Sequence, residues 1–370
     1  MEDSGLPREN PQIVTEIPRF DGFAEPYRAP VQPAKPPIHI PRTNRVLFAL
    51  TLLTTTLAGA QSAGVEVSFA HPLDALVGLS QGLSFSIPLM SILLAHEMGH
   101  FLMARRYGVD TSLPYFIPAI FPSIFSIGTF GAFIRMRSLP KTRRAMFDIG
   151  AAGPWVGFVI ALIAIIIGLK LSEVTPLDTA SGGIELGNSI VFWSLSRVIL
   201  GVDPDTVNII LHPAAFAGWI GLLVTALNLL PVGQLDGGHV VYSLFGPRWH
   251  RRISRAVWMG CLFMVLVPKL LALLPGVPEI NYWPGWIMWF LLILVLGLGH
   301  PVTQDAETPL AGKRRLAAWA TVLLFIVTFT PVPLSFVAPK EPIPPSEGPT
   351  YSVIHHAPPN SSLPRHSRAL

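Results

Sequence analysis

The stretch Ser91-Ile-Leu-Leu-Ala-His96-Glu97-Met-Gly-His100-Phe-Leu-Met103 places two histidines and a carboxylate inside a long apolar run. Ionisable groups inside a lipid-embedded helix are costly and usually serve a function. Without a metal, all three side chains would need polar partners in surroundings of low dielectric constant. This stretch therefore predicts a membrane-spanning helix that carries a functional site.

The spacing of the two histidines predicts metal binding. His96 and His100 are four residues apart, so they share one helix face about 6 Å apart along the axis. Both imidazoles can then reach one tetrahedral zinc ion, and Glu97 can touch a metal-bound water without taking a ligand position. This H-E-x-x-H pattern is the helix signature of a metalloprotease site. The alternatives are a structural trio without metal and a noncatalytic metal site, for example in a transporter.

A catalytic zinc needs a third protein ligand, and the segment 228–239 offers one. Asp236 is the only carboxylate within 206–278, and it lies next to an apolar run. Nearby helix-breaking residues are expected to interrupt the helix and turn Asp236 inward: Pro231, Gly233, Gly237 and Gly238. His239 is the competing candidate for the third ligand.

The composition indicates a membrane protein. Apolar residues make up 51% of the 370 residues and charged residues only 13%, whereas soluble proteins carry about 25% charged residues. This balance excludes a disordered chain and favours several membrane spans. The single cysteine, Cys261, excludes an intramolecular disulfide framework and a thiolate-rich zinc site. The net charge of +4 is accompanied by no nucleic-acid motif.

Hydropathy predicts an all-α polytopic fold. Residues 186–200 form a weaker apolar stretch that is expected to be an interfacial helix. Both ends of the chain, 1–45 and 338–370, are rich in proline and polar residues and are expected to be extended or disordered. We expect seven transmembrane helices, at 46–63, 84–104, 150–171, 210–230, 255–275, 284–300 and 315–337.

The distribution of lysine and arginine predicts an orientation. Basic loops alternate with acidic or uncharged ones along the chain, which fits a cytoplasmic N terminus and places the C-terminal tail on the other side. The first 45 residues are too long and too polar for a signal peptide and do not resemble a transit peptide. This favours a bacterial inner (plasma) membrane, with an organellar membrane as the alternative.

A short β-hairpin is expected between the first motif and the next span. The alternating run 127–136 contains Gly128 and Gly131 and is too broken for a spanning helix. It suits a hairpin that dips into the membrane beside the site, where its edge could pair with an unwound substrate strand. We therefore take Gly128 and Gly131 as candidate substrate-binding residues. The alternative is an interfacial loop that only covers the helix ends.

Two motifs together resemble a known family. The runs 96–100 and 228–238 (Asn-x-x-Pro-x-x-x-Leu-Asp-Gly-Gly) resemble the paired motifs of the site-2 protease family of intramembrane zinc metalloproteases, peptidase family M50. The segment Phe147–Pro154 resembles a further element of that family. The resemblance covers about residues 84–246, and the run 114–118 is similar to the plastid and bacterial branch.

The resemblance implies a three-helix catalytic core and cleavage of a transmembrane protein substrate. It implies that His96, His100 and Asp236 hold one zinc ion per chain and that Glu97 is the catalytic acid/base. Asn228 matches an asparagine of the family that helps to bind substrate or to stabilise the oxyanion. The loop 172–209 is too short for the PDZ domain of some members.

We therefore predict an intramembrane zinc metalloendopeptidase that acts on membrane proteins within the lipid bilayer. A nonproteolytic metal-binding protein or transporter is the alternative, and a membrane metalloprotease of another architecture is a further rival. The predicted organisation is a tail, a first span with its outer loop, the protease core, three additional spans and a second tail, at 1–45, 46–83, 84–246, 247–337 and 338–370.

Overall fold

The computed structural model describes residues 39–65, 67, 71–119, 127–176, 183–278, 280–305 and 308–337. Most of the predicted proline-rich tails, 1–38 and 338–370, lies outside these residues, as does the segment 120–126. The run 127–136, expected to form a hairpin, lies within them and contributes a single strand, 129–133. The chain separates into two units, Met1–Ile40 and Pro41–Leu370. All of the described helices and strands lie in the second unit.

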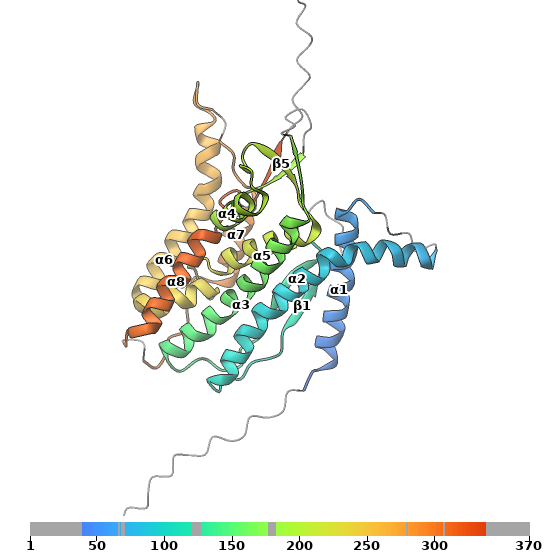
Figure 1. Cartoon of the computed structure of the whole chain (residues 1–370). Coiled ribbons are helices and arrows are strands. Elements are labelled where there is room, and N and C mark those ends of the chain that lie inside the picture. Colours follow the sequence, from blue (N-terminus) through green and yellow to red (C-terminus); the bar gives the residue numbers. More distant parts are fainter. Residues whose placement is uncertain are drawn as a thin grey trace, which may run out of the picture. The chain divides into compact units, whose positions relative to one another are not determined.

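The second unit is mostly helical, as the hydropathy predicts, with short strands between the helices (Figure 1). The helices are α1 (Arg42–Ser62), α2 (Pro72–Arg106), α3 (Arg143–Lys170), α4 (Ile190–Leu200), α5 (Pro213–Asn228), α6 (Asp236–Leu271), α7 (Gly285–Leu296) and α8 (Gly312–Thr328). The strands are β1 (Tyr115–Pro118), β2 (Thr129–Phe133), β3 (Glu173–Pro176), β4 (Gly183–Leu186), β5 (Val207–Ile210) and β6 (Leu334–Val337). They pair antiparallel as β1–β2, β3–β5 and β4–β6.

Three helical segments are long and apolar enough to cross a membrane by length and composition. They are Leu73–Arg106, Arg143–Lys170 and Asp236–Leu271. The other predicted spans fall on shorter helices or on α1. The helix at 284–300 is shorter than expected, because α7 ends at Leu296 and Gly297 adopts a positive φ of 87°. At about 1.5 Å per residue, the 12 residues of α7 extend only about 18 Å.

The centre of the unit is the packing of α3 between α2 and α5, which lie side by side in Figure 1. Small residues allow this close approach, since Gly168 of α3 lies against Ala215 of α5. Around these contacts is the main apolar core, which includes Phe85, Leu89, Ile92, Ile165, Leu169 and Leu222. The two predicted motifs lie on this scaffold, the first on α2 and the second from the end of α5 to the start of α6.

Helix α6 changes direction at Gly246, whose φ of 79° and ψ of 178° are not helical. Only glycine adopts this backbone readily, and Pro247 follows with no N–H to continue the helix. The predicted interruption at Gly237 and Gly238 is wrong, because both lie in the first turn of α6. The helical structure is interrupted earlier, between the end of α5 at Asn228 and the start of α6 at Asp236.

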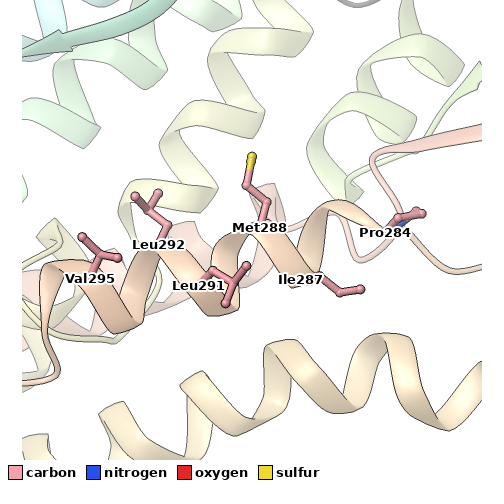
Figure 2. Close-up of a pocket in the computed structure, with 6 residues that line it drawn as sticks. All are labelled: Pro284, Ile287, Met288, Leu291, Leu292 and Val295. Atoms are coloured by element: carbon pink, nitrogen blue, oxygen red, sulfur yellow. The ribbon is translucent and has the colours of Figure 1, made fainter.

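An apolar face of α7 is open to the surroundings. Figure 2 shows the side chains that line it: Pro284, Ile287, Met288, Leu291, Leu292 and Val295. Water-soluble proteins rarely expose a continuous apolar patch of this kind, whereas lipid-facing helices do so routinely. The face is therefore in keeping with a helix that belongs to a membrane protein.

Candidate metal centre

The two histidines of the first motif point their Nε2 atoms at each other. His96 and His100 lie on neighbouring turns of α2, both are buried, and their Nε2 atoms are 3.1 Å apart. The Nδ1 atom of His100 is 2.7 Å from the carbonyl oxygen of Ile149 on α3. A carbonyl only accepts, so Nδ1 carries the proton and Nε2 of the neutral ring carries a lone pair. Helix α3 thereby sets the tautomer that metal binding requires.

Asp236 completes the cluster from the first residue of α6. Its Oδ2 atom lies 3.3 Å from Nε2 of His96 and 3.2 Å from Nε2 of His100. Glycines allow the helix to begin here: a Cβ on Gly237 would lie 2.0 Å from the carbonyl oxygen of Leu229. The structure thus brings together two residues of the first motif and one of the second. Among the described residues these three are the group arranged to hold a metal ion.

The part of α6 that follows Gly246 is hydrogen-bonded to the turn that precedes Asp236. The Nε2–H of His250 donates to the carbonyl oxygen of Gly233 at 3.0 Å, and the N–H of Gly233 donates to Oγ of Ser254 at 3.2 Å. Both side chains lie beyond the break at Gly246 and are buried. The turn and the two parts of α6 therefore form a closed loop that contains Asp236.

The geometry of the cluster fits zinc. Ligand atoms about 2.0–2.1 Å from a tetrahedral ion are about 3.3 Å apart, and the three separations here are 3.1, 3.2 and 3.3 Å. A metal ligand must be a neutral imidazole, and in that state Nε2 of His100 and Oδ2 of Asp236 both present lone pairs to the space between them. A cation placed there would be bound by both atoms. Two imidazoles and one carboxylate leave a fourth position for water, as in catalytic zinc sites.

Glu97 lies beside the ligands without belonging to the trio. Its side chain is buried and is close enough to His96, His100 and Asp236 to interact with them electrostatically. Its carboxylate accepts a hydrogen bond from the backbone N–H of Ile134, directly after β2. This contact orients the carboxylate and ties the strand pair to the metal centre.

The remaining predicted site residues occupy different places. Asn228, at the end of α5, brings its Nδ2 atom to 3.5 Å from Nε2 of His96, at the edge of the ligand cluster. Gly128 directly precedes β2 and Gly131 lies in its middle, with positive φ values of 78° and 98°. Gly128 packs against Thr54 of α1, and a Cβ at Gly131 would enter open space. These glycines therefore shape the strand pair, and the structure does not group them with the metal ligands.

His239, the competing third ligand, is engaged elsewhere. Its Nδ1 atom lies 2.7 Å from Nε2 of His300. His300 in turn has Nδ1 2.7 Å from the carbonyl oxygen of Pro301, so that His300 donates through Nδ1 and accepts through Nε2. His239 must then donate through its Nδ1–H. Asp236 rather than His239 lies with the histidine pair.

Sequence reasoning missed the residues that make room for the ligands. A Cβ on Gly153 of α3 would lie 2.1 Å from Nε2 of His100, and one on Gly157 would lie 3.1 Å from Cβ of His96. The two glycines are four residues apart and share one face of α3. That spacing, inside a span that follows the first motif, is the signal that could have identified them.

A second missed cluster joins the ends of three helices. The hydroxyl of Tyr107 donates to Asp148 of α3, and Nε of Arg314 in α8 lies 3.0 Å from the same carboxylate. Burial of the phenol, followed by its hydrogen bond to Asp148, raises the pKa of Tyr107 above its usual value. The phenol therefore remains a donor, and the cluster connects α2 to α3 and α8.

The fold and the site together define a class: a helical membrane protein with a buried site of two histidines and one aspartate, opened by an H-E-x-x-H helix. The profile of Peptidase family M50 matches residues 84–270, just over half of the chain. The chain belongs to Peptidase family M50, which confirms the resemblance seen in its motifs. The matched residues include all three clustered ligands and Glu97.

Similar proteins carry zinc metalloprotease names. The "Probable zinc metalloprotease EGY1, chloroplastic" of Arabidopsis thaliana is 37% identical over 49% of this chain and 32% of its own length. The EGY2 protein of the same plant is 27% identical over 71% of this chain and 44% of its own length. The EGY1 protein of Oryza sativa subsp. japonica is 39% identical over 42% of this chain and 27% of its own length. The chain thus spans less than half the length of each of these relatives.

Proposed function

We propose that this protein is an intramembrane zinc metalloendopeptidase that hydrolyses peptide bonds in or near the transmembrane segments of other proteins. One observation carries the proposal: three side chains that could hold a metal ion converge within a helical membrane protein, with a buried carboxylate beside them. Membership of Peptidase family M50 and the names of the relatives support it. The partners we propose are a transmembrane protein substrate and the surrounding lipid.

His96, His100 and Asp236 would hold the zinc ion, one per chain. When bound, zinc supplies a Lewis acid that acidifies water and polarises a carbonyl group. Glu97 removes the proton from the attacking water and returns it to the leaving amine. The N–H of Ile134 holds the Glu97 carboxylate in place for both transfers. The amide of Asn228, at the edge of the cluster, donates to the developing oxyanion.

The strand pair β1–β2 is the proposed substrate platform. Phe130, which is 72% exposed, and Phe133 offer apolar surface on β2. An unwound substrate segment would add a strand to the edge of β2, with the open space at Gly131 permitting close approach of its backbone and Gly128 holding the start of the strand against α1. This placement requires the pair to dip into the membrane, since the substrate's scissile bond lies there. Helix-destabilising residues in the substrate would favour cleavage.

We propose a seven-span topology in which α1, α5, α7 and α8 join the three longer helices. The open apolar face of α7 supports this arrangement. The arginine-rich loops would lie on the side of the N terminus, which we propose to be cytoplasmic if the protein resides in a bacterial plasma membrane. The relatives' names specify chloroplasts and support the alternative of an organellar membrane. The proposed protease core is 84–246, followed by additional spans to 337.

The decisive experiment compares Glu97→Gln with the wild type. We expect zinc in both proteins and cleavage of a single-span reporter only by the wild type, with a loss of about 100-fold or more, because general acid–base groups contribute about that much. Glu173→Gln, on the exposed strand β3, is the matched control and should cleave normally. Equal cleavage by Glu97→Gln would refute the role of Glu97. Zinc without cleavage in the wild type would favour the nonproteolytic alternative.

A further inference from the structure

Helix α1 holds the backbone at the beginning of both strands of the β1–β2 pair. The side-chain amide of Asn44 donates to the carbonyl oxygens of Leu113 at 3.2 Å and Pro114 at 2.8 Å, directly before β1. The hydroxyl of Thr54 lies 2.6 Å from the carbonyl oxygen of Gly128, directly before β2. The two contacts are ten residues apart, which is about 15 Å along the helix.

Each contact is specific to its position. Asn44 is only 5% exposed, so its donors are withdrawn from water and depend on these two carbonyl groups. The Thr54 hydroxyl also lies 3.1 Å from two carbonyl oxygens of its own helix, but Gly128 is the nearest acceptor. By contrast, within the part of the chain that the structure describes, the Thr56 hydroxyl of the same helix bonds only to the carbonyl oxygen of Leu52 one turn earlier.

Packing reinforces the hydrogen bonds. The ring of Phe48 on α1 meets the ring of Phe116 on β1 edge-on, with 5.1 Å between their centroids. A Cβ on Gly128 would lie 2.3 Å from the carbonyl oxygen of Thr54, so only glycine allows the two backbones to approach this closely. Strand β1 therefore rests on α1, while β2 leads toward the catalytic helix.

The other end of β2 touches the site. The strand runs for five residues from Thr129 to Phe133, and the N–H of the next residue, Ile134, donates to Glu97. A short extended strand thus connects the carbonyl group held by Thr54 to the residue that contacts Glu97. A displacement at Gly128 would be transmitted along the strand, because an extended segment of five residues has little slack.

We propose that α1 is a positioning element, and that Asn44 and Thr54 fix the register of the β1–β2 pair relative to Glu97 and so select which peptide bond is cut. This inference rests on the proposed protease function. Helix α1 lies outside the residues 84–270 that match the family. The proposal therefore assigns a role in the reaction to a segment that the family match does not include. Asn44 and Thr54 act through the strands and do not touch the substrate.

The test uses the full chain and four proteins: wild type, Thr54→Val, Thr54→Ser and Thr56→Val. Valine keeps the shape of threonine and removes the hydroxyl, and serine restores it. With a single-span reporter, Thr54→Val should raise KM about fivefold and add a second cleavage position, with kcat changed less than about twofold, because one net hydrogen bond contributes about 1 kcal/mol. Thr54→Ser and Thr56→Val should match the wild type in KM and cleavage position.

A second measurement does not depend on activity and adds a fifth protein, Asn44→Ala. Amide hydrogen exchange in 115–119 and 127–134 should rise in Thr54→Val and in Asn44→Ala, but not in Thr56→Val, while zinc content stays at the wild-type value in all of them. Equal exchange in Thr54→Val and Thr56→Val would overturn the positioning role, whether or not the wild type cleaves the reporter. Faster exchange with an unchanged KM and cleavage position would overturn the assignment of bond selection to α1.

Discussion

The imidazole of His100 lies against Gly153 of the neighbouring helix so closely that a Cβ at this glycine would lie 2.1 Å from the Nε2 atom. The Nε2 atom of His100, a proposed metal ligand, therefore occupies space that any other residue at position 153 would fill. The same helix supplies the carbonyl of Ile149 that sets the His100 tautomer. Helix α3 contributes none of the three clustered side chains. It nevertheless determines the position of the His100 ring and which ring nitrogen of His100 carries the proton.

Replacing Gly153 with alanine should displace His100 and release the metal. We expect Gly153→Ala to lower zinc affinity about 10- to 100-fold, the range found when groups that support metal ligands are lost. Zinc content of the purified protein at defined free zinc measures this. Gly260→Ala is the matched control, since a Cβ there meets nothing within 4 Å and alanine favours the helix. Full zinc affinity in Gly153→Ala would show that α3 can shift to accommodate the methyl group without displacing His100.

Replacing Asp236 with alanine should remove the third ligand. The two histidines alone cannot satisfy a tetrahedral ion, so we expect zinc affinity to fall by more than about 100-fold, beyond the usual effect of supporting groups. Activity should fall with it. The control is Asp74→Asn, an exposed residue in the first turn of α2. Full zinc occupancy in Asp236→Ala would transfer the ligand role elsewhere, first to His239.

Replacing His239 should separate stability from metal binding. Its Nδ1–H is used by His300, so His239→Gln should keep wild-type zinc content and lower the free energy of unfolding by about 1–3 kcal/mol through the lost buried hydrogen bond. Zinc content and thermal unfolding of the same preparations test both parts. If zinc and stability are lost together, His239 takes part in metal binding after all.

The cluster of Tyr107, Asp148 and Arg314 predicts that the stability of the protein changes at alkaline pH. Because the pKa of Tyr107 is raised above its ordinary value of 10.0, its contribution to stability is full below about pH 10 and is lost as the pH rises through the folded-state pKa. The Tm difference between wild type and Tyr107→Phe should therefore shrink above pH 10. Tyr115→Phe, which removes a hydroxyl from β1, is the control. A Tm difference for Tyr107→Phe that stays constant to high pH would contradict the assignment.

The sequence contained enough to predict which side chains meet at the metal centre. Helical spacing alone places His96 and His100 on one face, and Asp236 is the only carboxylate within a long apolar stretch. The mostly helical fold follows from composition and hydropathy, because apolar runs of this length have few other stable forms in a membrane. These features depend on local pattern, which a single sequence displays.

Other features depend on contacts between distant segments and could not be predicted in this way. The carbonyl partner of His100 and the clearance at Gly153 exist only once α3 packs on α2. The expected helix interruption at Gly237 was wrong, because this glycine lies inside α6 and allows the first turn of the helix to pack closely against the backbone of Leu229. The length of α7 was overestimated because hydropathy does not register the turn at Gly297.

The closed loop around Asp236 has a consequence for how the protein responds to metal. Because His250 and Ser254 hold Gly233, loosening the far part of α6 also frees the turn that presents Asp236. Metal binding and local unfolding of residues 248–254 would then be linked equilibria. Metal binding would stabilise the folded form of α6, and chelation of the metal would remove that stabilisation. Zinc bound at the proposed ligands would therefore stabilise a part of the fold that lies several helical turns from the ligands themselves.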